Sequence, residues 1–439
     1  MNTSKINELL DFIAQSPTAF QAVDTISDRL LKAGYIDLSE SKKWDLMPGN
    51  GYFVTRNRSS IIAFQIPKEK PHHFMISASH TDSPMFKLKN LFESPAFQTY
   101  MRLNTEVYGG TILSSWFDRP LSLAGRVIVK QDDNIFKSFS CKIDRDLLLI
   151  PNVAIHFNRS VNSGYAYNPA VDMLPLFSQE RKESGFLLQL IAEELKCKVD
   201  DIVGMDLYVY NRMPGTVWGA SNEFFSAPRI DNLMCAFATL ESFIAATNDS
   251  AVTLYYAADN EETGSATKQG AGSVFLSNVL DRICEQLYCN KQTMLASSMM
   301  VSADNAHAKH PNHPELSDGQ NAPHMNQGIV IKTNAAQKYA TDAMSSALFS
   351  EICRRAKVPY QFFANRSDTP GGSTLGNISN TLVPLLTVDI GMAQLAMHSA
   401  YETAGCADLD YLITAMTEFY STTLTVSADG VCYLQKKQK

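Results

Sequence analysis

Short apolar runs and amphipathic helical patterns alternate through the second half of the chain. Strands are predicted in the apolar runs "SAVTLYYAAD", "SMMVSAD" and "VPLLTVDIG", each of which is bounded by polar or turn-forming residues. Helices are predicted in "RIDNLMCAFATLESFIAAT", "SVFLSNVLDRICEQL", "AMSSALFSEICRRAKV" and "ADLDYLITAMTEFYSTTL". Strands and helices that alternate at this spacing favour an α/β fold with a mainly parallel central sheet.

The N-terminal region carries a similar pattern. An amphipathic helix is predicted in "MNTSKINELLDFIAQSPTAFQAV", two strands with a turn between them in "GYFVTRNRSSIIAFQI", and a further strand in "HHFMISASHTDSP". From residue 90 to residue 226 the pattern changes to short strands with Gly and Asp-Asn turns, and "LLQLIAEELKCKV" is its one clear helix. We therefore expect a discontinuous α/β domain, residues 1–89 and 227–439, interrupted by a smaller β-rich domain, residues 90–226.

Composition narrows the class of protein. The 439 residues allow two or three domains, and 45% hydrophobic and 19% charged residues are typical of a globular chain. A net charge of -7 without a Lys/Arg block argues against nucleic-acid binding. The chain lacks an apolar run that could cross a membrane and a signal-peptide pattern. Its eight cysteines are scattered without a C-x-x-C pair, so we expect reduced thiols in a cytoplasmic protein.

Acidic and histidine residues follow the predicted strands. Open α/β sheets bind ligands at the carboxyl ends of their strands, and most of the candidate residues fall there; only Asp231 opens a helix instead. The candidates are His80, Asp82, Asp231, Glu261, Glu262, Asp304 and His398.

Each candidate has a structural explanation when it is considered alone. A histidine in a strand-end loop is most often a surface or hydrogen-bonded core residue, and adjacent glutamates are commonly a solvated pair. Asp231 could be a helix N-cap and Asp304 could cap a turn. Their joint occurrence at strand ends favours a shared function.

Metal binding accounts for these residue types together. Imidazole and carboxylate ligands suit zinc, cobalt or manganese, and the lack of cysteine among them favours an open, catalytic site over a structural one. His80, Asp231, Glu262, Asp304 and His398 could hold two metal ions if one carboxylate bridges. Spacing alone does not choose the bridging residue.

The remaining two carboxylates have expected roles beside the metal. In the H-x-D pattern, alternate side chains of an extended segment point the same way, so Asp82 could orient His80 through its second ring nitrogen. Adjacent extended residues project to different sides, so Glu262 could bind metal while Glu261 stays unligated. A metal ion lowers the pKa of bound water to about 7, and Glu261 could then move its proton as general base.

Motifs along almost the whole chain resemble the M18 metallopeptidases, whose best-known members are aspartyl aminopeptidases. They occur in the family order: "SASHTDSP", "WFDRPLSLAGRV", "PNVAIHFNR", "APRIDNL", "DNEETGSATKQGAGS", "SADNAHAKHPNH", "KTNAAQKYATDA", "SDTPGGSTLG" and "QLAMHSAYE". A chance match does not explain several independent motifs in the same order over this length.

The resemblance implies a zinc-peptidase domain with two Zn²⁺ per subunit, for which Co²⁺ or Mn²⁺ could substitute. It implies Asp231 as the bridge, His80 and Asp304 on one ion, Glu262 and His398 on the other, and Glu261 as base. It also implies that the β-rich insert is a dimerisation domain. Dimers would assemble into a tetrahedral dodecamer whose interior chamber admits only small peptides.

The resemblance also implies four substrate-binding residues. His156 matches a histidine that reaches a neighbouring subunit's active site, and Lys332 matches a basic residue that recognises an acidic substrate side chain. His307 and Tyr339 match further pocket positions. The chain differs at Ala400 and Tyr401, where the family commonly has isoleucine and arginine, and at Thr263, where valine is more usual; the missing arginine bears on selectivity for acidic residues.

The expected activity is the metal-dependent removal of an N-terminal residue, preferably Asp or Glu, from small peptides. A broad neutral aminopeptidase is the nearest alternative, and a deacylase of N-acyl amino acids is a further one. From a different class, an oligomeric binding or cargo protein could keep the fold without turnover. The first two differ from the deacylase in requiring a free amine on the substrate.

Overall fold

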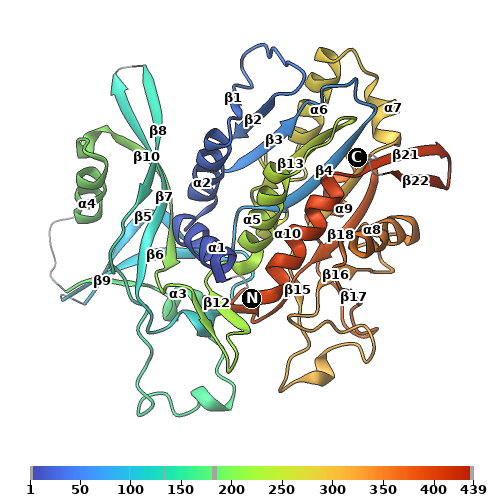
Figure 1. Ribbon diagram of the computed structural model, residues 1–439. Coiled ribbons are helices and arrows are strands. Elements are labelled where there is room, and N and C mark those ends of the chain that lie inside the picture. Colours follow the sequence, from blue (N-terminus) through green and yellow to red (C-terminus); the bar gives the residue numbers. More distant parts are fainter. Residues whose placement is uncertain (1–2, 98, 133, 180–184, 436–439) are drawn as a thin grey trace.

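The computed structural model describes residues 3–97, 99–132, 134–179 and 185–435, and a nine-stranded mixed sheet forms its centre (Figure 1). Its four middle strands β13, β4, β14 and β18 run parallel, and antiparallel pairings flank them. In order the strands are β1 (Ile36–Leu38), β2 (Gly51–Arg56), β3 (Ser60–Gln65), β13 (Ala251–Ala258), β4 (His73–His80), β14 (Met299–Ala303), β18 (Leu386–Gly391), β16 (Ile329–Lys332) and β17 (Tyr360–Phe363). The predicted α/β class with a mainly parallel central sheet is confirmed.

Helices cover both faces of this sheet because its strands are apolar on both sides. In β3, Ile61 and Ala63 join one hydrophobic core while Ile62 and Phe64 join the other, as the alternation of side chains requires. The first core includes α1 (Thr3–Gln15), α2 (Ala19–Lys32), α5 (Ile230–Ala245), α8 (Ala343–Ala356) and α10 (Cys406–Tyr420). The second includes α6 (Phe275–Gln286), α7 (Lys291–Ala296) and α9 (Leu375–Ser379).

The N-terminal pattern forms two helices where one was predicted. α1 ends at Gln15 and α2 begins at Ala19. Pro17 lies between them, and a proline lacks the N–H of a helical residue and disfavours helical geometry in the residue before it. After the break, the buried Gln21 amide of α2 donates to the carbonyls of Gly125 (2.7 Å) and Cys141 (3.2 Å), which belong to strands of a separate antiparallel sheet.

A six-stranded antiparallel sheet, here called the second sheet, lies on the left of Figure 1. Its order is β8 (Ile135–Lys142), β7 (Leu121–Asp132), β10 (Ile202–Asn211), β5 (Met85–Ala96), β6 (Tyr100–Tyr108) and β9 (Leu176–Ser178). The predicted helix of this region is α4 (Phe186–Leu195), and a short α3 (Pro169–Asp172) precedes it. The sheet thus begins at Met85, before residue 90, and the domain limits at 89/90 and 226/227 stay a prediction.

A third sheet, of five strands, combines strands from residues 216–227 with strands from the C-terminal half of the chain. Its order is β11 (Thr216–Trp218), β12 (Phe224–Ala227), β20 (Glu402–Gly405), β19 (Ala393–Leu395) and β15 (Ala306–His307). A C-terminal hairpin joins β21 (Thr423–Ala428) to β22 (Val431–Gln435). Within the described residues, no helix is both long and apolar enough to cross a lipid bilayer.

One buried histidine makes the fold sensitive to acid. His73 begins β4 and is 1% exposed, and its Nε2 accepts the backbone N–H of Leu424 at 3.3 Å. Burial, followed by the nearby His72, lowers the pKa of His73 to about 4 from the usual 6.5. Because the unfolded chain takes up this proton below pH 6.5 and the folded chain does not, His73 lowers stability as the pH falls from 6.5 to 4.

We predict that wild-type protein loses about 3 kcal/mol of unfolding free energy through His73 over this window, from about 1.4 kcal/mol per pKa unit. His73→Gln should remove this part of the pH dependence, because its amide oxygen can accept a hydrogen bond but does not titrate. Urea unfolding at several pH values measures it. His324→Gln, an exposed control, should keep the wild-type slope, and an unchanged slope in His73→Gln would contradict the prediction.

Candidate metal centre

The carboxyl ends of the middle strands bring the candidate residues together. His80 is the last residue of β4 and pairs in register with Ala258, the last residue of β13. Asp304 follows β14 directly, and the turn with Glu261 and Glu262 follows β13. Parallel strands end at one edge of a sheet, so residues far apart in sequence meet there.

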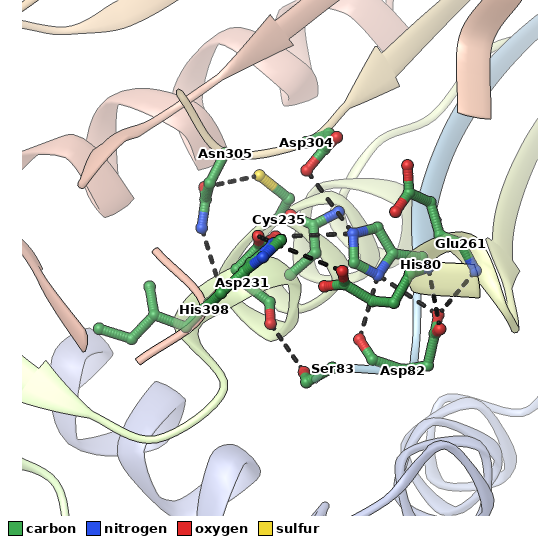
Figure 2. A network of polar contacts seen from close by, with 12 residues as sticks. His80, Asp82, Ser83, Asp231, Cys235, Glu261, Asp304, Asn305 and His398 are labelled. Atoms are coloured by element: carbon green, nitrogen blue, oxygen red, sulfur yellow. Dashed lines mark hydrogen bonds and ion pairs between the residues drawn. The ribbon is translucent and has the colours of Figure 1, made fainter. Parts of the chain in front are cut away.

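Two sets of side chains share Asp231 (Figure 2). In the first, His80 Nε2 lies 3.5 Å from Asp231 Oδ1 and 3.6 Å from Asp304 Oδ1. In the second, His398 Nε2 lies 3.4 Å from Asp231 Oδ2 and 3.3 Å from Glu262 Oε2. The two oxygens of Asp231 therefore face different histidines, as a bridging carboxylate would. Asp231 does not cap a helix with its side chain, and its φ and ψ of -80° and 111° are not helical.

Glu261 belongs to the same cluster but not through the geometry that was predicted. Glu261–Thr263 is a turn of 3₁₀ helix, η4, so the expectation that Glu261 and Glu262 are extended neighbours is wrong. Asn260 has a left-handed φ of 61° and turns the chain directly after β13. His80, Glu261 and Glu262 can still bring ligand atoms within 4.8 Å of one another, so Glu261 lies within reach of a ligand of this site.

The cluster concentrates negative charge away from water. Burial raises the pKa of Glu261 to about 8, and burial, followed by the charge of Asp231, raises that of Glu262 well above its usual range. Burial opposes ionisation of Asp231, but His398 and His80 hold its pKa below the usual range. Burial also opposes a charged His80, yet its contact with Asp231 raises its pKa. A cation at this position would relieve the repulsion among the carboxylates.

The geometry fits such a cation. Asp231 Oδ1 and Glu262 Oε1 are buried and have no hydrogen-bond partner among the described residues, which is costly unless an ion satisfies them. Two ligand atoms at 2.0–2.1 Å from a tetrahedral zinc are about 3.3 Å apart, and the four histidine–carboxylate separations are 3.3–3.6 Å. Nitrogen and oxygen donors without cysteine also suit zinc in an open site.

Asp82 lies beside the second ring nitrogen of His80, as predicted, but its shorter contacts are to other groups. His80 Nδ1 lies closest to the backbone carbonyl of Asp82, at 3.1 Å, and 3.5 Å from its carboxylate. The carboxylate instead accepts the backbone N–H groups of Glu261 (3.1 Å) and Glu262 (3.2 Å) and the hydroxyl of Tyr108 (2.8 Å). Asp82 therefore orients the glutamate turn.

Glu402 is a site residue that sequence reasoning missed. It is 1% exposed, and its carboxylate accepts the backbone N–H of Asp231 (2.9 Å) and of His398 (2.8 Å) and the amide of Gln394 (3.2 Å). Burial, then the charge of Asp231, raises its pKa to about 8. The glutamate four residues after His398 in "HSAYE" was the available signal. Glu402 thus connects the backbones of Asp231 and His398, two members of the second set.

Lys332 and Tyr339 lie beneath the metal-binding edge. Lys332 is 2% exposed, and its ammonium donates to the carbonyls of Asp304 (2.8 Å) and Asn305 (3.3 Å) and lies 3.8 Å from the Asp304 carboxylate. It also lies 5.2 Å above the buried ring of Tyr339. Burial opposes its charge, but Asp304 raises its pKa. Lys332 thus stays charged and holds the chain at Asp304.

His307 lies at a cavity beside the site. The cavity has a volume of about 340 Å³, and His307, Arg366, Gln394 and Met397, the residue before His398, are among the side chains that line it. Part of the His307 ring is exposed, while burial and the charge of Lys332 lower its pKa. The cavity offers room for a substrate side chain next to the candidate ligands.

His156 lies outside this cluster. It belongs to an exposed segment in which the backbone of Phe157 bonds that of Ala154 at 2.9 Å, and the long loop that contains it projects from the lower left of Figure 1. Its neighbours Ile155 and Phe157 are 48% and 88% exposed. The metal-ligand sets of the described residues do not include His156. The structure therefore does not place His156 in the metal site of its own chain.

The positions that differ from the family pattern have local partners. The Tyr401 hydroxyl donates to the carbonyl of Pro214 at 2.6 Å, and Ala400 is 3% exposed. The amide of Asn211 donates to the Ala400 carbonyl at 2.8 Å. These contacts keep the loop after His398 in place without an arginine at position 401.

A three-layer α/β fold with imidazoles and carboxylates around one shared aspartate is the architecture of a metal-dependent hydrolase. The family described as "Aminopeptidase I zinc metalloprotease (M18)" matches residues 12–420. A probable M18 family aminopeptidase 2 of Clostridium acetobutylicum is 44% identical over 94% of this chain and 98% of its own. Aspartyl aminopeptidase 1 of Schizosaccharomyces pombe is 38% identical over 94% of each chain.

Solved structures agree with these relatives. The chain superposes on one from a cryo-EM structure of the Ape4 and Nbr1 complex with a TM-score of 0.92 and 36% identity, over 95% of this chain and 85% of that one. A chain of the S. cerevesiae mApe1 dodecamer gives a TM-score of 0.84 and 26% identity, over 96% and 97%. The chain belongs to the M18 family: it is a zinc aminopeptidase, a hydrolase that acts as an exopeptidase.

We predict that Glu402→Gln lowers the free energy of unfolding by about 1–3 kcal/mol, because the amide nitrogen cannot accept and leaves a buried N–H unpaired. Urea unfolding of the metal-free protein measures the change without a contribution from bound metal. Glu285→Gln, at an exposed helical position, should unfold as wild type does. Equal midpoints for Glu402→Gln and wild type would show that Glu402 is dispensable for this loop.

Proposed function

We propose that the enzyme removes an N-terminal Asp or Glu from short peptides with the aid of two zinc ions. The supporting observation is that Asp231 lies within 3.5 Å of His80 and 3.4 Å of His398, each of which has a second carboxylate neighbour. His80, Asp231 and Asp304 would hold one ion, and Asp231, Glu262 and His398 the other. When bound, zinc would supply Lewis acidity that polarises a carbonyl group and acidifies a water molecule.

The chain's own residues divide the remaining tasks. Glu261, which the proposed ligand sets leave free, takes a proton from water and passes it to the leaving amine. Asp82 fixes the direction of Glu261 through the backbone N–H at 3.1 Å. The cavity beside His307 receives the first side chain of the peptide. Lys332, which is charged and close to this edge, favours a negative side chain there, with Tyr339 beneath it.

We also propose that the enzyme is a homo-oligomer, built from dimers into a tetrahedral dodecamer, in which His156 reaches a neighbouring site. Support comes from the dodecameric relative and from the exposed apolar side chains of Val153, Ile155 and Phe157 around His156, since exposed apolar groups of this kind favour an interface. Light scattering at assay concentrations gives the mass of the particle. A fully active monomer would contradict the proposal.

The selectivity test uses matched peptide substrates with N-terminal Asp, Glu, Leu or Ala, each free and N-acetylated, with zinc restored after chelation. We predict zinc-dependent cleavage of the free Asp and Glu substrates, and none of the acetylated set. Preference for Leu or Ala would indicate a broad neutral aminopeptidase, and cleavage of the acetylated set alone a deacylase. Lys332→Met should reduce the preference for Asp over Leu by about tenfold or more, whereas Arg366→Met, which removes a cation that lines the cavity, should retain it.

The role of Glu261 has its own test. Glu261→Gln should bind zinc as wild type does, because Glu261 is not among the proposed ligands, while kcat falls by about 10²–10⁴-fold through loss of the base. Zinc content and steady-state kinetics on the same preparation measure both. Full activity with full zinc content would reject Glu261 as the base.

A further inference from the structure

The segment Tyr108–Ser115, here called the strap, crosses from the second sheet to the metal centre. It follows β6 and ends in η1 (Leu113–Trp116). Trp116 is 3% exposed, its ring meets that of Phe86 edge-on at 5.1 Å, and its Nε1 donates to the Thr111 hydroxyl at 2.6 Å. The strap is therefore fixed to the core of the six-stranded sheet.

Four hydrogen bonds join the strap to the loop of His398, and one of them runs from the Thr111 hydroxyl to the carbonyl of His398 at 3.3 Å. His398 Nδ1 donates to the carbonyl of Gly110 at 3.0 Å, and the N–H of Ile112 donates to the carbonyl of His398 at 2.9 Å. Two residues further on, the N–H of Ala400 donates to the Ser115 hydroxyl at 2.8 Å. The strap thus holds both the ring and the backbone of a proposed ligand.

Gly109 permits this close approach, and Gly110 lies directly beside His398. Gly109 has a left-handed φ of 73°, and a Cβ there would lie 3.1 Å from the Cβ of Glu262. A Cβ on Gly110 would lie 3.5 Å from His398 Nδ1. The strap backbone therefore passes next to Glu262 and His398, the two ligands that the second set does not share with the first.

The first set is held by the central sheet instead. The carbonyl of Ala303, at the end of β14, accepts the amide of Asn232 at 2.9 Å, which ties the start of α5 to the residue before Asp304. Lys332 in β16 donates to the carbonyl of Asp304. His80 ends β4 itself. The two sets thus depend on different parts of the fold.

We propose that Ser115 is a positioning residue for zinc at the Asp231–Glu262–His398 set. It seats the His398 loop by accepting the N–H of Ala400, while its own hydroxyl donates to the Ile112 carbonyl at 2.6 Å. The second sheet is then a structural part of the metal centre in its own chain, in addition to any role in assembly. This inference rests on the ligands named in the proposed function.

The test is zinc titration of the metal-free, full-length protein against a competing chelator. Ser115→Ala should weaken one class of bound zinc by about 10–100-fold, the range for residues that orient metal ligands. Ser115→Thr, which keeps the hydroxyl, should restore wild-type affinity. Ser114→Ala removes the neighbouring exposed hydroxyl and should bind zinc as wild type does.

A double-mutant cycle assigns the effect to one set. His398→Ala should retain only the zinc of the first set, and adding Ser115→Ala to it should not weaken that ion further. If wild type binds no zinc, or His398→Ala binds it as wild type does, the ligands of the proposed function are wrong. If these two behave as expected but Ser115→Ala matches wild type, or Ser114→Ala and Ser115→Ala lose affinity equally, Ser115 has no positioning role.

Discussion

The buried carboxylate of Asp231 is the constraint on which the rest of the site depends. A charge that is 3% exposed needs compensation by its neighbours. Asp231 has a histidine within 3.5 Å of Oδ1 and 3.4 Å of Oδ2 and Glu402 at its backbone N–H, while Oδ1 accepts no hydrogen bond from the described residues. The partners come from β4, the loop after β19 and β20. Moving one of these elements would leave a buried charge unpaired, so the fold and the metal centre are specified together.

The parallel strands position one part of the site, and the five-stranded sheet and the strap position the other part. Strand ends bring His80 and Asp304 to one edge without special local geometry, because the register of β4 and β14 aligns them. Glu262 reaches the same edge through the turn that follows the left-handed Asn260. His398 comes from a loop and has a left-handed φ of 68°, a conformation that needs support from its surroundings. Glu402 and the strap supply that support.

The sequence predicted this edge of the sheet well because apolar strands and the polar residues that follow them are local features. It did not predict the turn at Glu261, which depends on the left-handed Asn260, or the partner of the Asp82 carboxylate, which lies 179 residues away at Glu261. The contacts of the strap with His398 could not be predicted, because they use mainly backbone groups that every residue carries. The sequence shows Glu402 four residues after His398, but no motif reveals which backbone N–H groups its carboxylate accepts.

Lys332 links the proposed metal site to the proposed substrate selectivity. Its ammonium donates to the carbonyl of the proposed ligand Asp304, and its charge lies 3.8 Å from the Asp304 carboxylate. The same charge is the proposed attraction for an acidic substrate. A change at Lys332 therefore alters the position of a metal ligand along with the electrostatic potential of the pocket. Under the proposed function, selectivity for a negative side chain would use a cation that also holds a proposed metal ligand.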